Sequence, residues 1–201
     1  MNPWTGSSRR HFFNQQAATW DDHPKIAEQQ ARLRELLAGV PVRRGASALD
    51  LGCGTGIAIP ALAAAVGRIG RVIGLDESSA MIFKACKIHP GVVVGDALEL
   101  PFTGTIFDFV LAFAVLPHLD DPIRFLVESS RVLRPAGRIL VLHFMSRAQC
   151  NDFHRHAGSA VEHDILPAPS QLNQWARIAG LEPIQFRESD DLFLWLAAKS
   201  A

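Results

Sequence analysis

The most constraining stretch of this chain is residues 46–66, where a short apolar run leads through three alternating glycines into a second apolar segment. Residues 46–51 have the composition of a buried strand, and residues 57–66, rich in Ala, Ile and Leu, are typical of a helix. Gly52 and its two partner glycines lie between them. Glycine lets the backbone turn sharply and approach a ligand closely, and the start of a helix supplies free N–H donors. The stretch predicts a strand–turn–helix unit that can hold a ligand.

The spacing of the glycines separates two classes of ligand. A dinucleotide-binding turn has the pattern Gly-x-Gly-x-x-Gly, whose third glycine allows close packing of the helix. Here the third glycine comes one residue early, at Gly56, and Ile57 occupies the required position. An acidic residue, Asp50, also lies within the end of the strand. The pattern disfavours a nicotinamide dehydrogenase and resembles the first motif of class I S-adenosylmethionine-dependent methyltransferases. A tight turn without a ligand is the alternative.

The second predicted strand, residues 71–75, ends at an acidic pair, Asp76 and Glu77. Asp76 comes 20 residues after Gly56, which is the reach expected across one strand–helix–strand unit. A carboxylate at this point can accept two hydroxyl hydrogens. The sequence therefore predicts that Asp76 holds a ribose diol.

The third predicted strand, residues 91–95, ends at Asp96 and Ala97. The resemblance implies that Asp96 accepts a hydrogen bond from the adenine amino group and that the Ala97 N–H meets a ring nitrogen. It also implies that Met81 packs on the adenine face. Without the resemblance, Asp96 would serve to cap a short turn, and Met81 would be assigned to the core by default.

The remaining motifs follow in the order of the same family. Residues 105–113 predict a strand whose Phe-Asp-Phe-Val-Leu run resembles the fourth motif, and residues 114–122 resemble the next loop of small-molecule methyltransferases. Arg-Val-Leu-Arg-Pro-Ala-Gly at residues 131–137 predicts a turn before a strand over residues 138–143, and this phrase is characteristic of the class. The resemblance covers residues 10–145.

The N-terminal arm is rich in aromatic residues. Residues 12–21, Phe-Phe-Asn-Gln-Gln-Ala-Ala-Thr-Trp-Asp, are similar to the segment that precedes the core in quinone-biosynthesis-type methyltransferases, where it covers cofactor and substrate. Polar flanks that break secondary structure favour a mobile lid that becomes ordered when cofactor binds. The alternative is that Phe12, Phe13 and Trp20 belong permanently to the core.

The elements together predict an α/β fold. Residues 181–187 and 191–198 are typical of an antiparallel hairpin. We expect a Rossmann-like, seven-stranded, mostly parallel sheet with an antiparallel last strand and helices on both faces. The length suits one domain. The expected parts of this single domain, 1–201, are a helical arm or lid (1–40), a cofactor-binding half (41–143), and a substrate-side insertion with the closing hairpin (144–201).

The resemblance and the strand ends together predict the site. The expected cofactor is S-adenosyl-L-methionine, with S-adenosyl-L-homocysteine as product. The candidate cofactor-binding residues are Asp50, Gly52, Cys53, Gly54, Gly56, Asp76, Glu77, Met81, Asp96, Ala97, Ala112 and Phe113. The candidate substrate or lid residues are Phe12, Phe13, Trp20, Leu116 and Phe144. A base is needed only when the acceptor carries a proton of high pKa, and the candidates are His118 and His143, which are equally suited to being satisfied buried histidines.

Composition limits the partners. The chain has 20 Lys and Arg against 20 Asp and Glu, so its neutral balance gives no sign of a nucleic-acid partner, and Arg9 and Arg10 are expected to be solvated. Three widely spaced cysteines favour a reducing, cytoplasmic compartment. No apolar run has the length of a membrane span. No metal is expected, because His154 and His156 are two residues apart and point to different sides of a helix.

The sequence narrows the acceptor less than the cofactor. Ala112 to Val115 replace the Asn/Asp-Pro-Pro-aromatic motif of many amino-methylating enzymes, and the Pro-Cys nucleophile of cytosine C5 methylation is missing from this region. The aromatic and apolar candidates favour a small, partly apolar acceptor: a quinone precursor, another aromatic, or a metabolite carboxylate or amine. A non-catalytic S-adenosylmethionine-binding sensor or scaffold is the alternative function. The oligomeric state is left undetermined.

Overall fold

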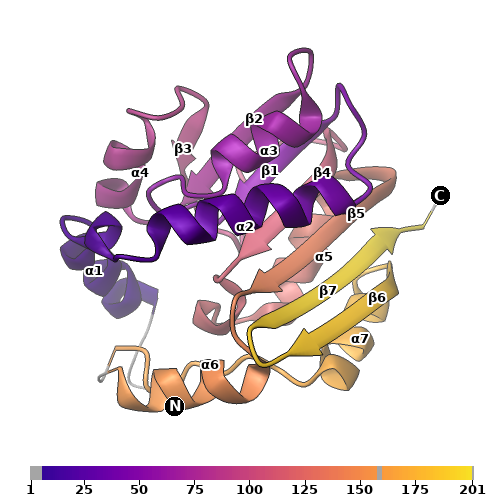
Figure 1. Ribbon diagram of the computed structural model, residues 1–201. Coiled ribbons are helices and arrows are strands. Elements are labelled where there is room, and N and C mark those ends of the chain that lie inside the picture. Colours follow the sequence, from indigo (N-terminus) through magenta and orange to yellow (C-terminus); the bar gives the residue numbers. More distant parts are fainter. Residues whose placement is uncertain (1–5, 158–159, 201) are drawn as a thin grey trace.

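The computed structural model describes residues 6–157 and 160–200. In this part of the chain seven strands form one sheet in the order β3-β2-β1-β4-β5-β7-β6 (Figure 1). The strands are β1 Ser47–Leu51, β2 Arg71–Asp76, β3 Val92–Val94, β4 Phe107–Phe113, β5 Leu133–His143, β6 Leu181–Ser189 and β7 Leu192–Lys199. The helices are α1 Gly6–Gln16, α2 Ile26–Gly39, α3 Ile59–Val66, α4 Ser79–Ala85, α5 Pro122–Val132, α6 Arg147–His156 and α7 Pro169–Ile178, with short 3-10 helices η1 Trp20–Asp22 and η2 Leu116–His118.

The strand directions confirm the predicted fold class. β1 pairs in parallel with β2 and β4, and the parallel set continues to β3 and β5. β7 runs antiparallel to both β5 and β6. The chain order reverses between β1 and β4, and open α/β sheets bind ligands at the carboxyl ends of the strands beside such a reversal.

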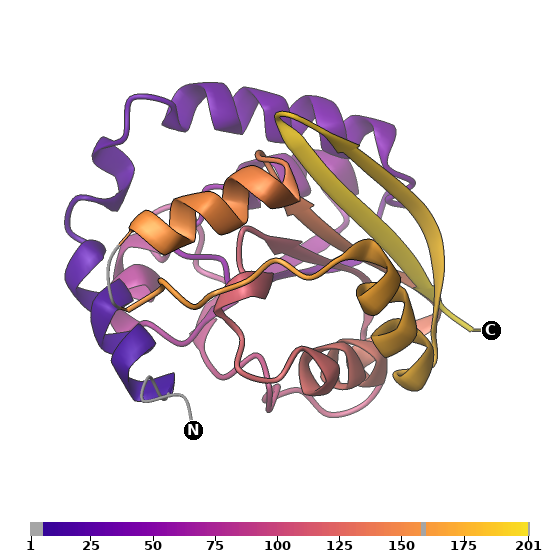
Figure 2. The same cartoon turned by 90° about the horizontal axis from the view of Figure 1, so that it is seen from below.

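Apolar side chains cover both faces of the sheet. Leu49 and Leu51 of β1 belong to the core on the side of α5 and α7, whereas Ala46 and Ala48 belong to the core on the side of α2 and α3. Because both faces of β1 are covered, apolar residues occupy positions on either side of the strand. Seen from below, α2 lies on one side of the sheet and α5 and α7 lie on the other (Figure 2). The two faces are therefore layered as predicted.

Side-chain caps fix the starts of two helices near the strand ends. Ser78 Oγ accepts a hydrogen bond from the Met81 N–H at the start of α4. Ser146 and Gln149 form a reciprocal capping box at the start of α6. Each cap satisfies N–H groups that a helix start leaves without a partner. Both helices consequently begin within a few residues of the strand that precedes them.

The turn predicted over residues 131–137 is wrong in part. β5 already begins at Leu133, which pairs with Phe107. The pairing then shifts register, and Arg138 is the next residue of β5 to pair, with Phe109. Ala136 takes a left-handed conformation in between, with φ of 60°. The strand thus continues through an irregularity in the ladder at which Ala136 leaves the extended conformation, and a motif of Pro and Gly does not distinguish such an irregularity from a turn.

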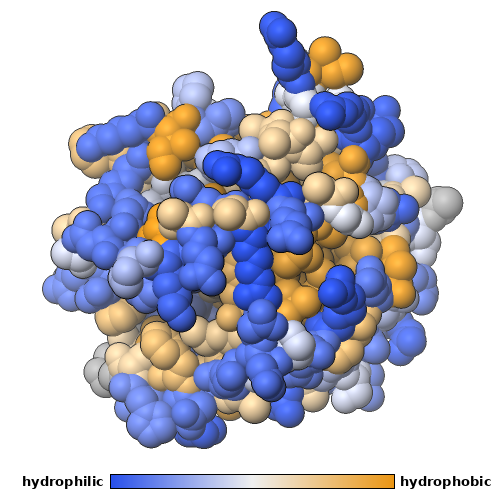
Figure 3. All heavy atoms as spheres, viewed as in Figure 1, coloured by the Kyte–Doolittle hydropathy of each residue, from blue (hydrophilic) through white to orange (hydrophobic). Residues whose placement is uncertain are grey.

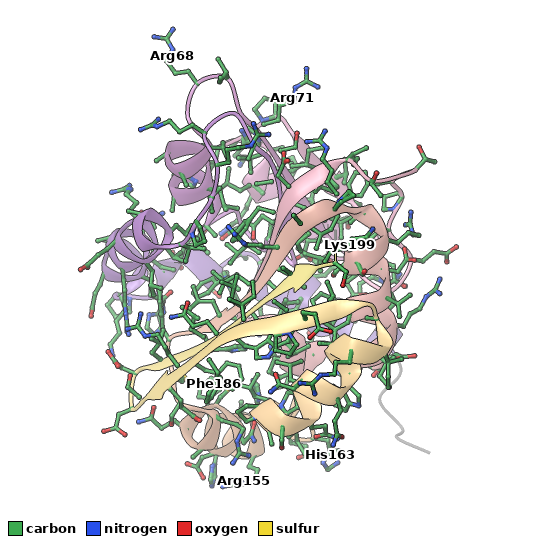
Figure 4. All side chains as sticks on the ribbon, turned by 90° about the vertical axis from the view of Figure 1, so that its right-hand side faces the viewer. Arg68, Arg71, Arg155, His163, Phe186 and Lys199 are labelled. Atoms are coloured by element: carbon green, nitrogen blue, oxygen red, sulfur yellow. The ribbon has the colours of Figure 1, made fainter. Side chains whose placement is uncertain are left out.

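The described surface is mixed in character. In Figure 3, hydrophilic side chains are interspersed with smaller apolar areas. Figure 4 labels Phe186, which belongs to the outer strand β6 and is 40% exposed. Scattered apolar side chains of this kind are ordinary on soluble proteins. Within the described residues, no helix combines the length and the apolar composition that crossing a membrane requires.

Candidate functional site

A cavity of about 510 Å³ lies where the carboxyl ends of the parallel strands meet. Its walls come from the segments that follow β1, β2, β4 and β5, from α6, and from the N-terminal arm. Figures 1 and 2 show α1 and α6 at this end of the sheet. The lining residues that concern us are Arg9, Phe13, Trp20, Asp50, Gly52, Cys53, Gly54, Asp76, Glu77, Met81, Asp96, Ala97, Phe113, His118, His143, Phe144, Cys150, Phe153 and His154.

The glycine turn after β1 is sterically required. Gly52 has φ of 72°, and a Cβ at this position would lie 2.3 Å from Val115 Cγ2. The N–H groups of Gly52 and Cys53 both donate to the Leu75 carbonyl, at 2.8 and 3.0 Å. The turn is therefore held against β2 in a backbone conformation that only glycine adopts easily. Gly54, with φ of 54°, has open space where its Cβ would be.

Asp76 closes the turn from the end of β2. Its Oδ2 accepts the Gly54 N–H at 2.9 Å, and its Oδ1 accepts the Ser78 N–H at 2.8 Å. Burial raises the pKa of Asp76 above its usual value, although these two N–H groups act in the opposite direction. Each carboxylate oxygen has a second lone pair. The side chain can therefore accept two further hydrogens from a ligand in the cavity.

Asp50 is the most deeply buried acid of the cavity wall, with 1% exposure. Its Oδ2 has no hydrogen-bond partner among the described residues. Burial raises the pKa of Asp50 to about 7, and the nearby charge of Asp76 adds to the shift. A buried carboxyl oxygen without a partner is costly unless a ligand satisfies it. The site thus combines the unpartnered carboxyl of Asp50, a glycine turn and the carboxylate of Asp76. These groups fit a nucleoside that carries an ammonium group.

Most predicted cofactor residues come together here, with two exceptions. Gly56 and Ala112 do not line the cavity. Gly56 faces Ile59 and Ala85, where a Cβ would lie 3.4 and 3.5 Å from their side chains, so it serves the packing of α3 and α4. Ala112 is fully buried within β4. The structure thus places both residues beneath the site instead of at its surface.

Some of the predicted substrate and lid residues line the cavity, and others do not. Phe13, Trp20 and Phe144 line the cavity. Phe12 does not, and instead packs edge-on against Phe13 with ring centroids 5.3 Å apart. Leu116 does not line the cavity either: it lies in η2, is 1% exposed and belongs to the hydrophobic core.

The two candidate bases differ in their surroundings. His143, at the end of β5, is 4% exposed, and burial lowers its pKa to about 3. Its Nε2 has no partner among the described residues, and its Nδ1 lies 3.9 Å from Cys150 Sγ. The Nδ1 of His118, in contrast, lies 2.6 Å from Asp164 Oδ2. Both rings line the cavity, but only His118 has a carboxylate partner.

Sequence reasoning missed three polar residues of this region. Arg9 is 5% exposed and Asp164 is 2% exposed, and they form an ion pair. The expectation that Arg9 is solvated is therefore wrong. His154 of α6 is buried and stacks edge-on with His118 at 5.0 Å between centroids. No local pattern marks these contacts, because each joins segments that are distant in the sequence: Arg9 and Asp164 are 155 residues apart, and His118 and His154 belong to different elements.

The histidines and acids of the segment after β5 are not arranged as a metal-binding cluster among the described residues. Among the described residues, no group of three or more His, Cys, Asp or Glu side chains is arranged to hold a metal ion. Figure 4 shows Arg155 and His163 at the outer edge of this segment. The His156 and His163 side chains are 74% and 60% exposed.

Two protein families match parts of the chain. Residues 49–141 match the methyltransferase domain family, and residues 8–88 match the protein-L-isoaspartate(D-aspartate) O-methyltransferase family. The first match contains the glycine turn, Asp76 and Asp96. The second includes the N-terminal arm.

Curated relatives match about half of the chain. An uncharacterized 37.1 kDa protein of transposon Tn4556 from Streptomyces fradiae is 42% identical over 111 residues, which are 53% of this chain and 32% of that protein. Demethylmenaquinone methyltransferase of Staphylococcus aureus is 38% identical over 114 residues, which are 54% of this chain and 47% of that enzyme. The chain therefore spans a third to a half of the length of these relatives.

Solved structures show the same fold. A methyltransferase of Haloferax volcanii, solved in complex with the Trm112 methyltransferase activator, is 22% identical and superimposes with a TM-score of 0.80, over 94% of this chain and 98% of that one. This likeness concerns the fold. The family match shows a methyltransferase domain over residues 49–141, and the cofactor that this match implies is S-adenosylmethionine.

Proposed function

We propose that this domain transfers the methyl group of S-adenosylmethionine to a small, partly apolar acceptor. The observation that carries the proposal is one continuous cavity with two kinds of wall. One wall holds the glycine turn with Asp50, Asp76 and Asp96, and the other holds aromatic side chains with His118. A methyltransferase needs both walls in one space, because donor and acceptor must meet in line.

The residues of the first wall are suited to the cofactor. Asp76 would accept hydrogen bonds from the ribose hydroxyls, and Asp96 from the adenine amino group. The unpartnered Oδ2 of Asp50 favours the neighbourhood of an ammonium group. When bound, S-adenosylmethionine supplies an already activated methyl group. The task left to the chain is to align the acceptor and to exclude water.

The second wall supports an aromatic acceptor. Phe13, Phe144 and Phe153 line the cavity, together with Trp20 of the arm. These side chains favour a flat apolar ring, and His118 favours a hydroxyl or another ionisable group on it. The similarity to a demethylmenaquinone methyltransferase supports a quinone-precursor-like ring as the first class to test. Other aromatics and metabolite carboxylates or amines are the next classes.

The test is turnover of donor labelled in its methyl group against a panel of hydroquinones, phenols, amines and carboxylates. We expect labelled product with one of these classes, and loss of labelling in Asp76→Ala. Calorimetry with S-adenosylhomocysteine and with NAD should show binding of the first alone. Tighter binding of NAD contradicts the cofactor assignment. Binding of S-adenosylhomocysteine without transfer to any acceptor favours a non-catalytic sensor or scaffold.

A further inference from the structure

Three segments that are distant in sequence meet at one carboxylate beside the cavity. Asp164 lies between α6 and α7, Arg9 lies on α1, and His118 ends η2. Arg9 Nε and one of its terminal nitrogens donate to Asp164 Oδ1, at 2.9 and 2.7 Å. His118 Nδ1 lies 2.6 Å from the other oxygen, Oδ2. Each oxygen of Asp164 is thus assigned to one partner.

The network is shielded from solvent. The side chains of Arg9 and Asp164 are 6% and 1% exposed, and that of His118 is 18% exposed. Burial lowers the pKa of Arg9, but hydrogen bonds to Asp120 and Asp164 outweigh this effect and leave it above the ordinary value. Arg9 therefore keeps its charge and holds the carboxylate in place. A buried charged network of this kind is specific in geometry, because removing one member leaves the others without a partner.

The contact with Asp164 determines which nitrogen of His118 carries the proton. A carboxylate can only accept, so a neutral His118 must donate through Nδ1. The lone pair is then on Nε2, at the other side of a ring that lines the cavity. Phe13 packs edge-on against the same ring at 5.1 Å between centroids and restricts its rotation.

We propose that Asp164 and Arg9 are positioning residues that hold His118 as a general base, so that docking of the N-terminal arm completes the base. The proposal rests on the proposed function for the identity of the reaction. The acceptor's ionisable proton passes to His118 Nε2 as the acceptor–methyl bond forms and the sulfur–methyl bond breaks. The positive charge of the sulfonium then resides on the imidazolium, beside Asp164.

Several charged groups face His118 and set the direction of each test. Asp164 and, behind it, Arg9 and Asp120 lie on one side. His154 of α6 lies against the ring, and both Asp76 and His143 lie near enough to interact with its charge. Removing the negative charge of Asp164 disfavours protonated His118, and removing the positive charge of Arg9 favours it.

The first test needs no acceptor. Histidine-selective ¹⁵N NMR of the S-adenosylhomocysteine complex should show His118, assigned by its loss in His118→Gln, with the proton on Nδ1. In Asp164→Asn, Arg9 holds the amide oxygen, so the amide NH₂ faces His118 Nδ1 and moves the proton to Nε2. We expect the Nε2–H form to rise at least severalfold. An unchanged tautomer overturns the proposal.

The second test uses opposite shifts. The titration midpoint of His118 should move to lower pH in Asp164→Asn and to higher pH in Arg9→Gln, with Arg9→Lys restoring most of the wild-type value. An ion pair without electrostatic contact with His118 would leave the midpoint unchanged in both variants. Asp152→Asn is the matched control, because Asp152 is an exposed carboxylate on α6 paired with Arg155. Should Asp164→Asn not fold, the Arg9 variants decide the question, and an unchanged midpoint in Arg9→Gln overturns the proposal.

Turnover provides the third test. With an acceptor in hand, kcat of Asp164→Asn should fall about 100-fold or more, while S-adenosylhomocysteine affinity stays within about threefold. Wild-type kcat in Asp164→Asn contradicts the general base. The expected tautomer without transfer to any acceptor leaves this assignment standing and contradicts the proposed function alone.

Discussion

The two walls of the cavity are built in different ways. The wall with Asp50, Asp76 and Asp96 comes from successive strand ends within one stretch of the chain, and backbone N–H groups hold the carboxylates of Asp76 and Asp96. In the other wall, Arg9 and His118 line the cavity and both contact Asp164, so side-chain charges join segments up to 155 residues apart. The first wall follows from the order of the strands, whereas the second depends on how distant segments pack. The two walls should therefore respond differently to substitution.

The largest expected effect is on the backbone of the first wall. Gly52→Ala places a Cβ against Val115 at a φ of 72°, so we expect a loss of about 3–5 kcal/mol in the free energy of unfolding. Urea denaturation measures it. Gly54→Ala is the matched control, since its Cβ would meet open space, and we expect a loss of about 1 kcal/mol or less. Equal losses in the free energy of unfolding of the two variants would contradict a steric clash between the Cβ at position 52 and Val115.

The next effect concerns affinity. Asp76→Ala deletes a carboxylate that we assign to the ribose, so binding of S-adenosylhomocysteine should weaken by about 1.5–3 kcal/mol, roughly ten- to 150-fold. Titration calorimetry measures it, with Asp152→Asn as the surface control. The fold should persist, because Asp76 lies at the end of β2 and not in the core. Unchanged affinity would exclude Asp76 from the cofactor site.

A smaller effect concerns the pH dependence that His143, another residue lining the cavity, gives to stability. His143 has a pKa of about 3 in the folded protein, against an ordinary value near 6.5 when unfolded. The unfolded chain therefore binds more protons in this window, and the contribution of His143 to stability is lost as pH falls from 6.5 toward 3. Between pH 7 and pH 5, His143→Gln should lose about 1–2 kcal/mol less stability than the wild type.

Urea denaturation at the two pH values measures this difference. Asp50 and Glu77, each with a pKa raised to about 7 chiefly by burial, act with the opposite sign but are common to both proteins. His156→Gln is the control, because the His156 side chain is 74% exposed. A wild-type pH dependence in His143→Gln would contradict the buried neutral state of this histidine.

The smallest effect concerns the arm. Asn14 accepts from Ser78 Oγ and the Ala80 N–H, and Lys84 donates to the Ala18 carbonyl, so a few polar contacts join α1 to α4. We expect S-adenosylhomocysteine to slow protease cleavage within residues 6–20 about threefold to tenfold, a shift of about 1 kcal/mol in the opening equilibrium. Asn14→Ala should speed cleavage in both states. Cleavage that is equally slow with and without ligand would show fixed packing instead of a lid.

More of the first wall than of the second could be predicted from the sequence. The glycine turn and the acids at the ends of β2 and β3 were predictable, because motif order and strand ends are local properties. Asp164 was visible only as one polar residue among several, and Arg9 only as half of a basic pair. The burial of Leu116 was not predictable, because it lies in the short helix η2 within a loop, where no periodicity applies. Long-range charge pairing has no signature in a single sequence.

The capping box of α6 has a consequence for how such a chain can change. Ser146 and Gln149 fix where α6 begins, and Cys150, Phe153 and His154 then face the cavity from one side of that helix. None of these three belongs to the strand ends that surround the glycine turn. Evolution or directed selection can therefore vary three neighbouring side chains on a helix of fixed origin and retune which molecules are accepted. The nucleotide-recognition machinery would be inherited unaltered.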